Sequence, residues 1–167
     1  MSVDLEHAVR ELAAGLLRYC AARTRDSSLA EEIAQECLAA LVQRWRRHGP
    51  PASPEAFVFA VARRRSARAL VRRRLLLPLQ YLQVRNYSAP SPESLALDRS
   101  DLRRLLRAMD RLSAREREAL LLVVVGGLST AGAARAIRIS ESALKMRVSR
   151  ARERLHALLE DNHEDRR

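Results

Sequence analysis

The chain has 167 residues and carries 31 Lys and Arg against 20 Asp and Glu, which gives a formal charge of +11. Apolar residues make up 47% of it, too many for a disordered polymer, while five glycines and 4% aromatics disfavour a sandwich or barrel of many strands. Two cysteines cannot build a disulfide framework, and no apolar run approaches the roughly 20 residues that span a bilayer. We therefore expect a basic, all-α, cytoplasmic protein without membrane insertion, whose first candidate partner is a polyanion.

Two helices are predicted at the start of the chain. Apolar residues at helical spacing mark the first over residues 5–22. Ser28, followed three residues later by Glu31, has the spacing of a capping box that opens the second helix, over residues 28–47. Both cysteines lie on inward stripes of these helices, so we expect buried thiols and no metal site.

A third helix follows the breaker at 48–52, with Ser53 as its cap and Pro54 in its first position. Seven arginines then occur within residues 63–74, on nearly every side of the helix. A helix of this kind cannot be buried against protein, so it lies in water or on nucleic acid. A coding sequence rich in G and C is an alternative reason for arginine in place of lysine, but it does not explain the net charge.

Residues 78–97 are predicted to form a linker, because prolines, serines and an asparagine replace the helical pattern there. A structureless loop of about twenty residues inside one compact domain is unusual. We therefore expect two small helical domains, residues 1–77 and 98–167, with separate cores and a flexible tether between them.

Four helices are predicted after the linker. A short one lies over residues 102–109, and Ser113 with Glu116 forms a second capping box that opens the next. Ser129 and Ser140 cap the last two, which are separated by a tight turn. This pair has the form of a helix-turn-helix, whose second helix enters the major groove of DNA.

The last helix has an apolar stripe centred on Leu144, and its opposite face carries short or cationic side chains. Small side chains allow close approach to DNA, and cations meet phosphate or guanine. The candidates for duplex contact are Ser140, Ser142, Lys145, Met146, Ser149 and Arg150. A helical hairpin that packs without DNA is the alternative interpretation.

These segments resemble the sequence of a known family. Residues 112–122, 127–134 and 139–152 are similar to region 4 of bacterial sigma factors, above all to the extracytoplasmic-function (ECF) group. Residues 30–36 resemble the region 2 helix that binds the clamp of RNA polymerase, and residues 57–64 resemble the region 2 stretch that melts the promoter. The two matches occur in the family's order, with a linker between them.

The resemblance implies a transcription initiation subunit that is not an enzyme and needs no cofactor or metal. Region 2 would bind core polymerase and open the minus-ten element as single strand, and region 4 would read the minus-35 element as duplex. The implied partners are core RNA polymerase, promoter DNA and an anti-sigma factor.

The resemblance also assigns residues to the first domain. Contact with core polymerase is expected at Glu31, Glu32, Gln35, Glu36 and Ala39. Contact with minus-ten DNA is expected at Phe57, Phe59, Arg63, Arg64, Arg65 and Arg68, because aromatic rings stack on bases and cations hold the strand. A solvated acidic face and core packing of the aromatic rings are the respective alternatives.

Four positions depart from the family pattern. The usual tryptophan, asparagine, acidic residue and turn glycine are replaced here by Phe57, Arg64, Gly132 and Arg138, respectively. A residue other than glycine in a left-handed turn costs roughly 1 kcal/mol, which a domain tolerates. The departures therefore bear on the promoter sequence more than on the fold.

Two other functions fit parts of the sequence. A stand-alone DNA-binding regulator has a similar helix-turn-helix, but such proteins carry an α/β receiver, and residues 1–97 show no strand pattern. The second alternative is a sigma-like protein that only sequesters an anti-sigma factor. The departures at Gly132 and Arg138 favour this alternative. Catalysis has little support, because the four histidines are scattered and no glycine-rich phosphate loop occurs.

Overall fold

The computed structural model describes residues 3–76 and 99–164, in which the regular elements are all helical, as predicted. The first half contains α1 (Val3–Thr24), α2 (Ser27–His48) and α3 (Pro54–Leu76). The second contains α4 (Arg99–Asp110), α5 (Ala114–Leu120), the π-helix η2 (Leu121–Val125), α6 (Thr130–Ile137) and α7 (Glu141–Glu164). No described helix combines the length and the apolar character needed to cross a bilayer. The predicted linker at 78–97 lies outside the described residues.

Capping side chains begin most helices where the sequence indicates. The Oγ atoms of Ser53, Ser129 and Ser140 each accept a hydrogen bond from the backbone N–H three residues later, at 3.0–3.2 Å. Ser113 and Glu116 form both bonds of a capping box, which lowers the pKa of the Glu116 carboxyl. These caps satisfy N–H groups that have no partner within the first turn.

The start of α2 differs from the prediction. Its cap is Asp26, whose Oδ1 accepts from the N–H of Leu29 at 3.1 Å, so the predicted Ser28 is inside the helix. The other carboxylate oxygen of Asp26 accepts from the guanidinium of Arg73 on α3 at 3.0 Å. Asp26 is therefore the N-cap of α2 in place of Ser28, because its carboxylate both caps α2 and pairs with Arg73 of α3.

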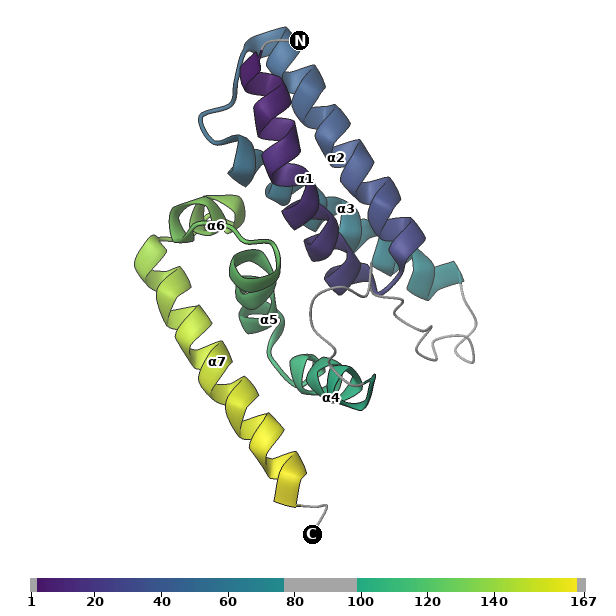
Figure 1. Ribbon diagram of the computed structural model, residues 1–167, viewed down its shortest axis with the longest axis vertical. Helices are drawn as coiled ribbons and strands as arrows, with labels where there is room; N and C mark the ends of the chain where they lie inside the picture. Colours follow the sequence, from purple (N-terminus) through teal and green to yellow (C-terminus); the bar gives the residue numbers. More distant parts are fainter. Residues whose placement is uncertain (1–2, 77–98, 165–167) are drawn as a thin grey trace.

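The buried apolar side chains form one cluster that passes through both halves of the chain. Leu16 and Phe59 from the first half, and Leu122 and Leu144 from the second, are each at most 1% exposed. Figure 1 shows α1–α3 at one end of the molecule and α4–α7 at the other, and α1 packs on η2 while α3 packs on α6. The expectation of two separate cores is therefore corrected: the halves share a core.

Both cysteines are buried and free, as predicted from their place on inward stripes. Burial raises the pKa of Cys20 to about 12 and that of Cys37 to about 11. Among the described residues, no group of three or more His, Cys, Asp or Glu is placed to hold a metal ion. The two thiols therefore act as small apolar core groups.

We expect neither Cys20 nor Cys37 to react with Ellman's reagent in the folded chain at about pH 8, because the thiolate is the nucleophile and both pKa values are raised. Both should react at once in concentrated guanidinium chloride. Since the unfolded thiols lose their protons at lower pH than the folded ones, the free energy of unfolding should fall as the pH rises above about 9. Rapid reaction of a thiol without denaturant would contradict its burial.

Candidate nucleic-acid interface

The turn between α6 and α7 has the left-handed conformation that the sequence pattern requires. Arg138 occupies it with φ 57° and ψ 53°, in the position where the family pattern has glycine. The N–H of Arg138 donates to the carbonyl of Arg135 at 3.3 Å, and the N–H of Ile139 donates to that of Ala134 at 3.1 Å. These bonds close α6 and fix the angle at which α7 leaves the turn.

Helix α7 separates a buried stripe from an exposed polar face. Leu144, Val148 and Ala151 are buried against the rest of the second half. The residues predicted to contact duplex DNA are all exposed, namely Ser140, Ser142, Lys145, Met146, Ser149 and Arg150. No ion pair engages Lys145 or Arg150 within the described residues. The face has the short and cationic side chains that reading of a major groove requires.

The residues predicted to contact minus-ten DNA differ in their exposure to solvent. Arg64 and Arg68 are exposed on α3, whereas Phe57, Arg63 and Arg65 are half-buried. Arg65 pairs with Glu36 of α2, so it also ties two helices together. The side chains available to a nucleic acid are therefore fewer than the sequence indicates.

Phe59 is assigned to the core instead of to a DNA surface. Its ring is 1% exposed and meets the ring of Tyr19 edge to face, with centroids 5.4 Å apart. A phenylalanine buried in this way cannot stack on a base while the two halves are packed together. The alternative interpretation of core packing holds for this residue.

The predicted polymerase-binding residues lie together on one face of α2. Glu31, Glu32, Gln35, Glu36 and Ala39 are all exposed, whereas Ile33 and Cys37 of the same helix are buried. The structure thus brings these five residues together on a surface that is mostly acidic in a strongly basic chain.

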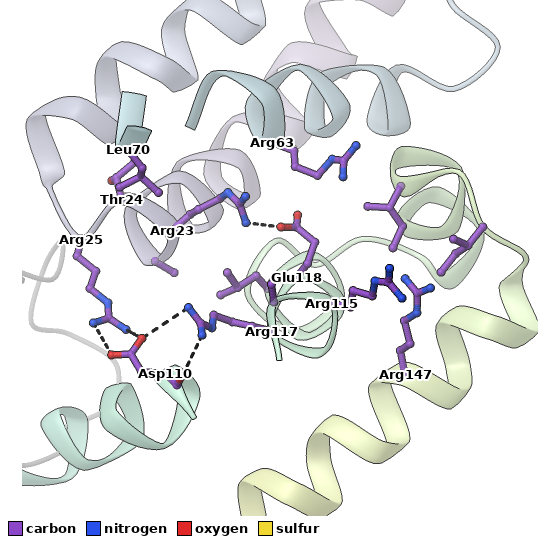
Figure 2. Close-up of a pocket in the computed structure, with 15 residues that line it drawn as sticks. Arg23, Thr24, Arg25, Arg63, Leu70, Asp110, Arg115, Arg117, Glu118 and Arg147 are labelled. Carbon is purple, nitrogen blue, oxygen red and sulfur yellow. Dashed lines mark hydrogen bonds and ion pairs between the residues drawn. The ribbon is translucent and has the colours of Figure 1, made fainter. Parts of the chain in front are cut away.

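A buried acidic side chain joins the two halves. Glu118 of α5 accepts a hydrogen bond from the hydroxyl of Tyr19 on α1 at 2.6 Å. It also pairs with the guanidinium of Arg23 on the same helix α1 (Figure 2). Burial, and next the charge of Glu118, raise the pKa of Tyr19 far above its usual range, so the hydroxyl keeps its proton and donates. Removal of any one of the three groups would leave a buried partner unsatisfied.

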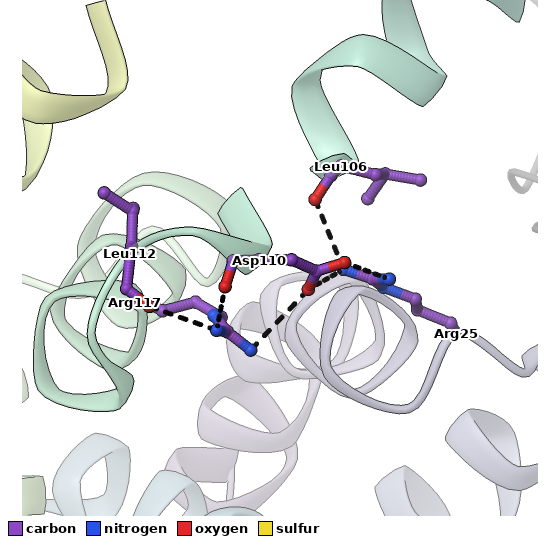
Figure 3. Close-up of polar contacts among 5 residues, drawn as sticks. All are labelled: Arg25, Leu106, Asp110, Leu112 and Arg117. Carbon is purple, nitrogen blue, oxygen red and sulfur yellow. Dashed lines mark hydrogen bonds and ion pairs between the residues drawn. The ribbon is translucent and has the colours of Figure 1, made fainter. Parts of the chain in front are cut away.

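A second polar cluster joins the end of α1 to the end of α4 (Figure 3). The guanidinium of Arg25 donates to both carboxylate oxygens of Asp110, at 2.8 and 2.6 Å. Arg117 donates to the carbonyls of Asp110 and Leu112 at 3.0 and 3.1 Å, which ties α5 to the same corner. A bidentate pair of this kind fixes orientation as well as distance.

Glycines allow close approach where the halves meet. A Cβ atom on Gly15 of α1 would lie 2.2 Å from the carbonyl oxygen of Gly126, which follows η2. A Cβ on Gly132 of α6 would lie 2.0 Å from the carboxylate of Glu55 on α3. That carboxylate accepts from the N–H and hydroxyl of Ser129 at 2.9 and 3.2 Å. Glu55 thus places a negative charge beside α6, where the family pattern has an acidic residue at position 132 itself.

The residues that join the halves are not indicated by the sequence pattern. Tyr19 and Gly15 lie beside the apolar stripe predicted for α1, and both are buried because the second half covers that side of the helix. One signal was present in the sequence: glycine in the middle of a helix costs about 1 kcal/mol relative to alanine, so Gly15 indicates a packing requirement.

Comparison with known proteins identifies the family. A model of sigma-70 region 2 matches residues 8–75, and one of sigma-70 region 4 matches residues 102–155. The ECF RNA polymerase sigma factor SigD of Mycobacterium tuberculosis is 33% identical over 150 residues, which cover 84% of this chain and 69% of SigD. The chain belongs to the ECF sigma factors. ShbA, the ECF sigma factor of Streptomyces griseus, is 31% identical over 155 residues, which cover 86% of this chain and 81% of ShbA.

Other similarities support the same fold. An uncharacterized protein of Rhizobium meliloti is 35% identical over 150 residues, but this ECF chain spans only 34% of its length. Sigma factor RpoE, in complex with the anti-sigma factor NepR from Bartonella quintana, has a similar structure, with TM-score 0.71 and 23% identity over 95% of this chain and 98% of RpoE. CnrH, in complex with the cytosolic domain of CnrY, gives TM-score 0.67 and 20% identity over 94% and 88%.

Substitution of Gly15 by alanine is expected to separate the halves of this ECF chain. The added methyl group collides with the backbone of Gly126, and overpacking of this kind costs about 1–3 kcal/mol, although alanine itself favours the helix. Small-angle X-ray scattering should therefore give a larger radius of gyration for Gly15→Ala.

The control is Ala14→Ser, which adds one heavy atom at the neighbouring exposed position of α1 and should leave the radius unchanged. If Gly15→Ala is as compact as the parent chain, the close contact between α1 and Gly126 does not hold the halves together.

Proposed function

We propose that this ECF sigma factor binds core RNA polymerase and directs transcription initiation at specific promoters, with α3 at the minus-ten element and α7 at the minus-35 element. The observation that carries the proposal is the exposed polar face of α7, which follows a left-handed turn at Arg138. Lys145 and Arg150 on this face have the charge and reach for phosphate or guanine. The order of regions 2 and 4 in the chain supports the division of labour between the two elements.

The exposed face of α2 is proposed to bind the polymerase. Its glutamates, among them Glu32, are not buried by any other part of the described chain. An acidic face on a protein of charge +11 favours a basic protein surface over DNA, because like charges repel. Ala39 adds a small apolar contact beside the charges.

Promoter binding is proposed to require separation of the halves. Helix α6 covers part of α3, and the shared core holds Phe59, so the full surface of α3 is accessible only when the halves part. Two small domains on one chain then reach two promoter elements at once, and the first contact raises the effective concentration for the second.

An anti-sigma factor is proposed as a further partner. RpoE, which has a similar fold, was solved in complex with the anti-sigma factor NepR. A partner that binds both halves in the closed arrangement would keep α3 from DNA, and this would keep the sigma factor inactive.

The test of the proposed function is transcription in vitro with core RNA polymerase and a library of promoters. Addition of the full chain should give initiation at a defined set of start sites, and the chain should be retained by immobilised core polymerase. Absence of binding to core polymerase would remove the proposal, and a DNA footprint formed without polymerase would favour a stand-alone regulator. Binding to an anti-sigma factor without any initiation would favour sequestration alone.

Substitutions on α7 and on α3 are expected to impair different steps, which two separate assays measure. Lys145→Glu with Arg150→Glu is expected to weaken binding to duplex minus-35 DNA by about tenfold or more, because each good base or phosphate contact contributes about 1–3 kcal/mol. Arg63→Glu with Arg64→Glu should leave that binding intact and reduce the permanganate reactivity of minus-ten thymines, which reports melting.

The matched control is Arg103→Glu with Arg107→Glu, which makes the same change in charge on the exposed side of α4. It should change both assays only slightly. Equal losses in both assays for both DNA variants would contradict the division between α3 and α7.

A further inference from the structure

A cavity of about 770 Å³ lies between the two halves of the chain (Figure 2). Six arginines line it, three from each half: Arg23, Arg25, Arg63, Arg115, Arg117 and Arg147. Among the described residues, two carboxylates line the same space, those of Asp110 and Glu118. The wall formed by these residues therefore carries an excess of four positive charges.

Three of these arginines form ion pairs with the two carboxylates, and two of the three share Asp110. Arg23 pairs with Glu118, and Arg25 and Arg117 pair with Asp110. The other three, Arg63, Arg115 and Arg147, form no ion pair within the described residues. Figure 2 shows the ends of these three side chains on the same side of Glu118, away from Asp110.

Hydrogen-bond donors are also left over in this region. The Nε atoms of Arg23, Arg63 and Arg117 are buried and have no hydrogen-bond partner among residues 3–76 and 99–164. A buried donor without a partner costs free energy, and this cost is larger for a charged group. The cationic wall, with three guanidinium groups outside any ion pair of the described residues, favours a compact ligand with several negative oxygens.

We propose that the cavity binds a small anion with a chain of two or more phosphate groups. Guanidinium groups bind phosphate oxygens bidentately, and arginine is the residue best suited to this geometry. The volume is typical of a small-molecule site and exceeds what a single phosphate needs. Leu121, Ile137 and Ile139 line the same space, and they offer an apolar surface to a base or sugar attached to the phosphates.

The ligand would act as a clamp between the halves. Each half contributes three of the arginines, and these two groups of positive charge repel each other across the cavity. An anion bound between them would attract the arginines of both halves. Arg63 is also one of the residues proposed to contact minus-ten DNA. If the proposed function holds, the anion and the promoter would therefore compete for Arg63.

The test is titration calorimetry of the full chain with sodium tripolyphosphate, ATP and GTP, and with inorganic phosphate at matched ionic strength. Tripolyphosphate should bind with one equivalent per chain and about tenfold or more tighter than phosphate, because more arginines are engaged at once. Tighter binding of a nucleotide than of tripolyphosphate assigns the site to nucleotides, and the reverse order assigns it to inorganic polyphosphate.

Variants locate the site. Arg63→Gln with Arg147→Gln should weaken tripolyphosphate binding by about tenfold or more. Arg46→Gln with Arg103→Gln removes the same charge from exposed positions outside the cavity, one in each half, and should leave binding within about twofold.

Thermal unfolding gives a second readout if a variant is less stable. Saturating tripolyphosphate should raise Tm for the parent chain and the control variant, and not for the cavity variant. Equal affinities for the two variants, or several weak equivalents per chain, would overturn the proposal. None of these measurements involves polymerase or DNA, so failure of the anion site leaves the proposed role in transcription standing.

Discussion

The closed structure depends on the close approach of two strongly basic halves, which repel each other by charge alone. In the part of the chain that the structure describes, three carboxylates oppose this repulsion: Glu55 reaches from the first half to the start of α6, and Asp110 and Glu118 reach from the second half to α1 and its end. Gly15 and Gly126 let backbone meet backbone, so that these side chains come within hydrogen-bond distance. Apolar packing attracts the halves to each other but does not fix their relative orientation. The hydrogen bonds and ion pairs of the carboxylates fix that orientation.

The arrangement separates the surfaces of this ECF sigma factor into two kinds. The polar face of α7 and the acidic face of α2 point outward in the closed chain. The buried side of α3, by contrast, faces the second half and contributes Phe59 to the shared core. Under the proposed function, a closed chain would thus keep two of its three contact surfaces available and withhold part of the third.

The sequence predicts helices, caps and the helix-turn-helix well, because these depend on neighbours within a few residues. Ser53, Ser113 and Ser129 cap the helices that the pattern assigns to them. The shared core could not be predicted in the same way. An apolar stripe shows that a face is covered but does not show which segment covers it. Tyr19 lies off the stripe, and its burial involves Phe59 of α3 and, about a hundred residues away in the chain, Glu118 of α5. Phe59 was ambiguous for the same reason.

The π-helix η2 has a consequence for the geometry of the whole second half. Its extra residue shifts the backbone bonds so that the N–H of Gly126 donates to the carbonyl of Leu121. In an ordinary α-helix each residue turns the chain by about 100°, so an insertion or deletion here would rotate everything downstream by that amount about the axis of α5. The π-helix therefore sets the rotation of the helix-turn-helix about the axis of α5. This rotation determines which side of α6 and α7 faces the first half and which side faces solvent.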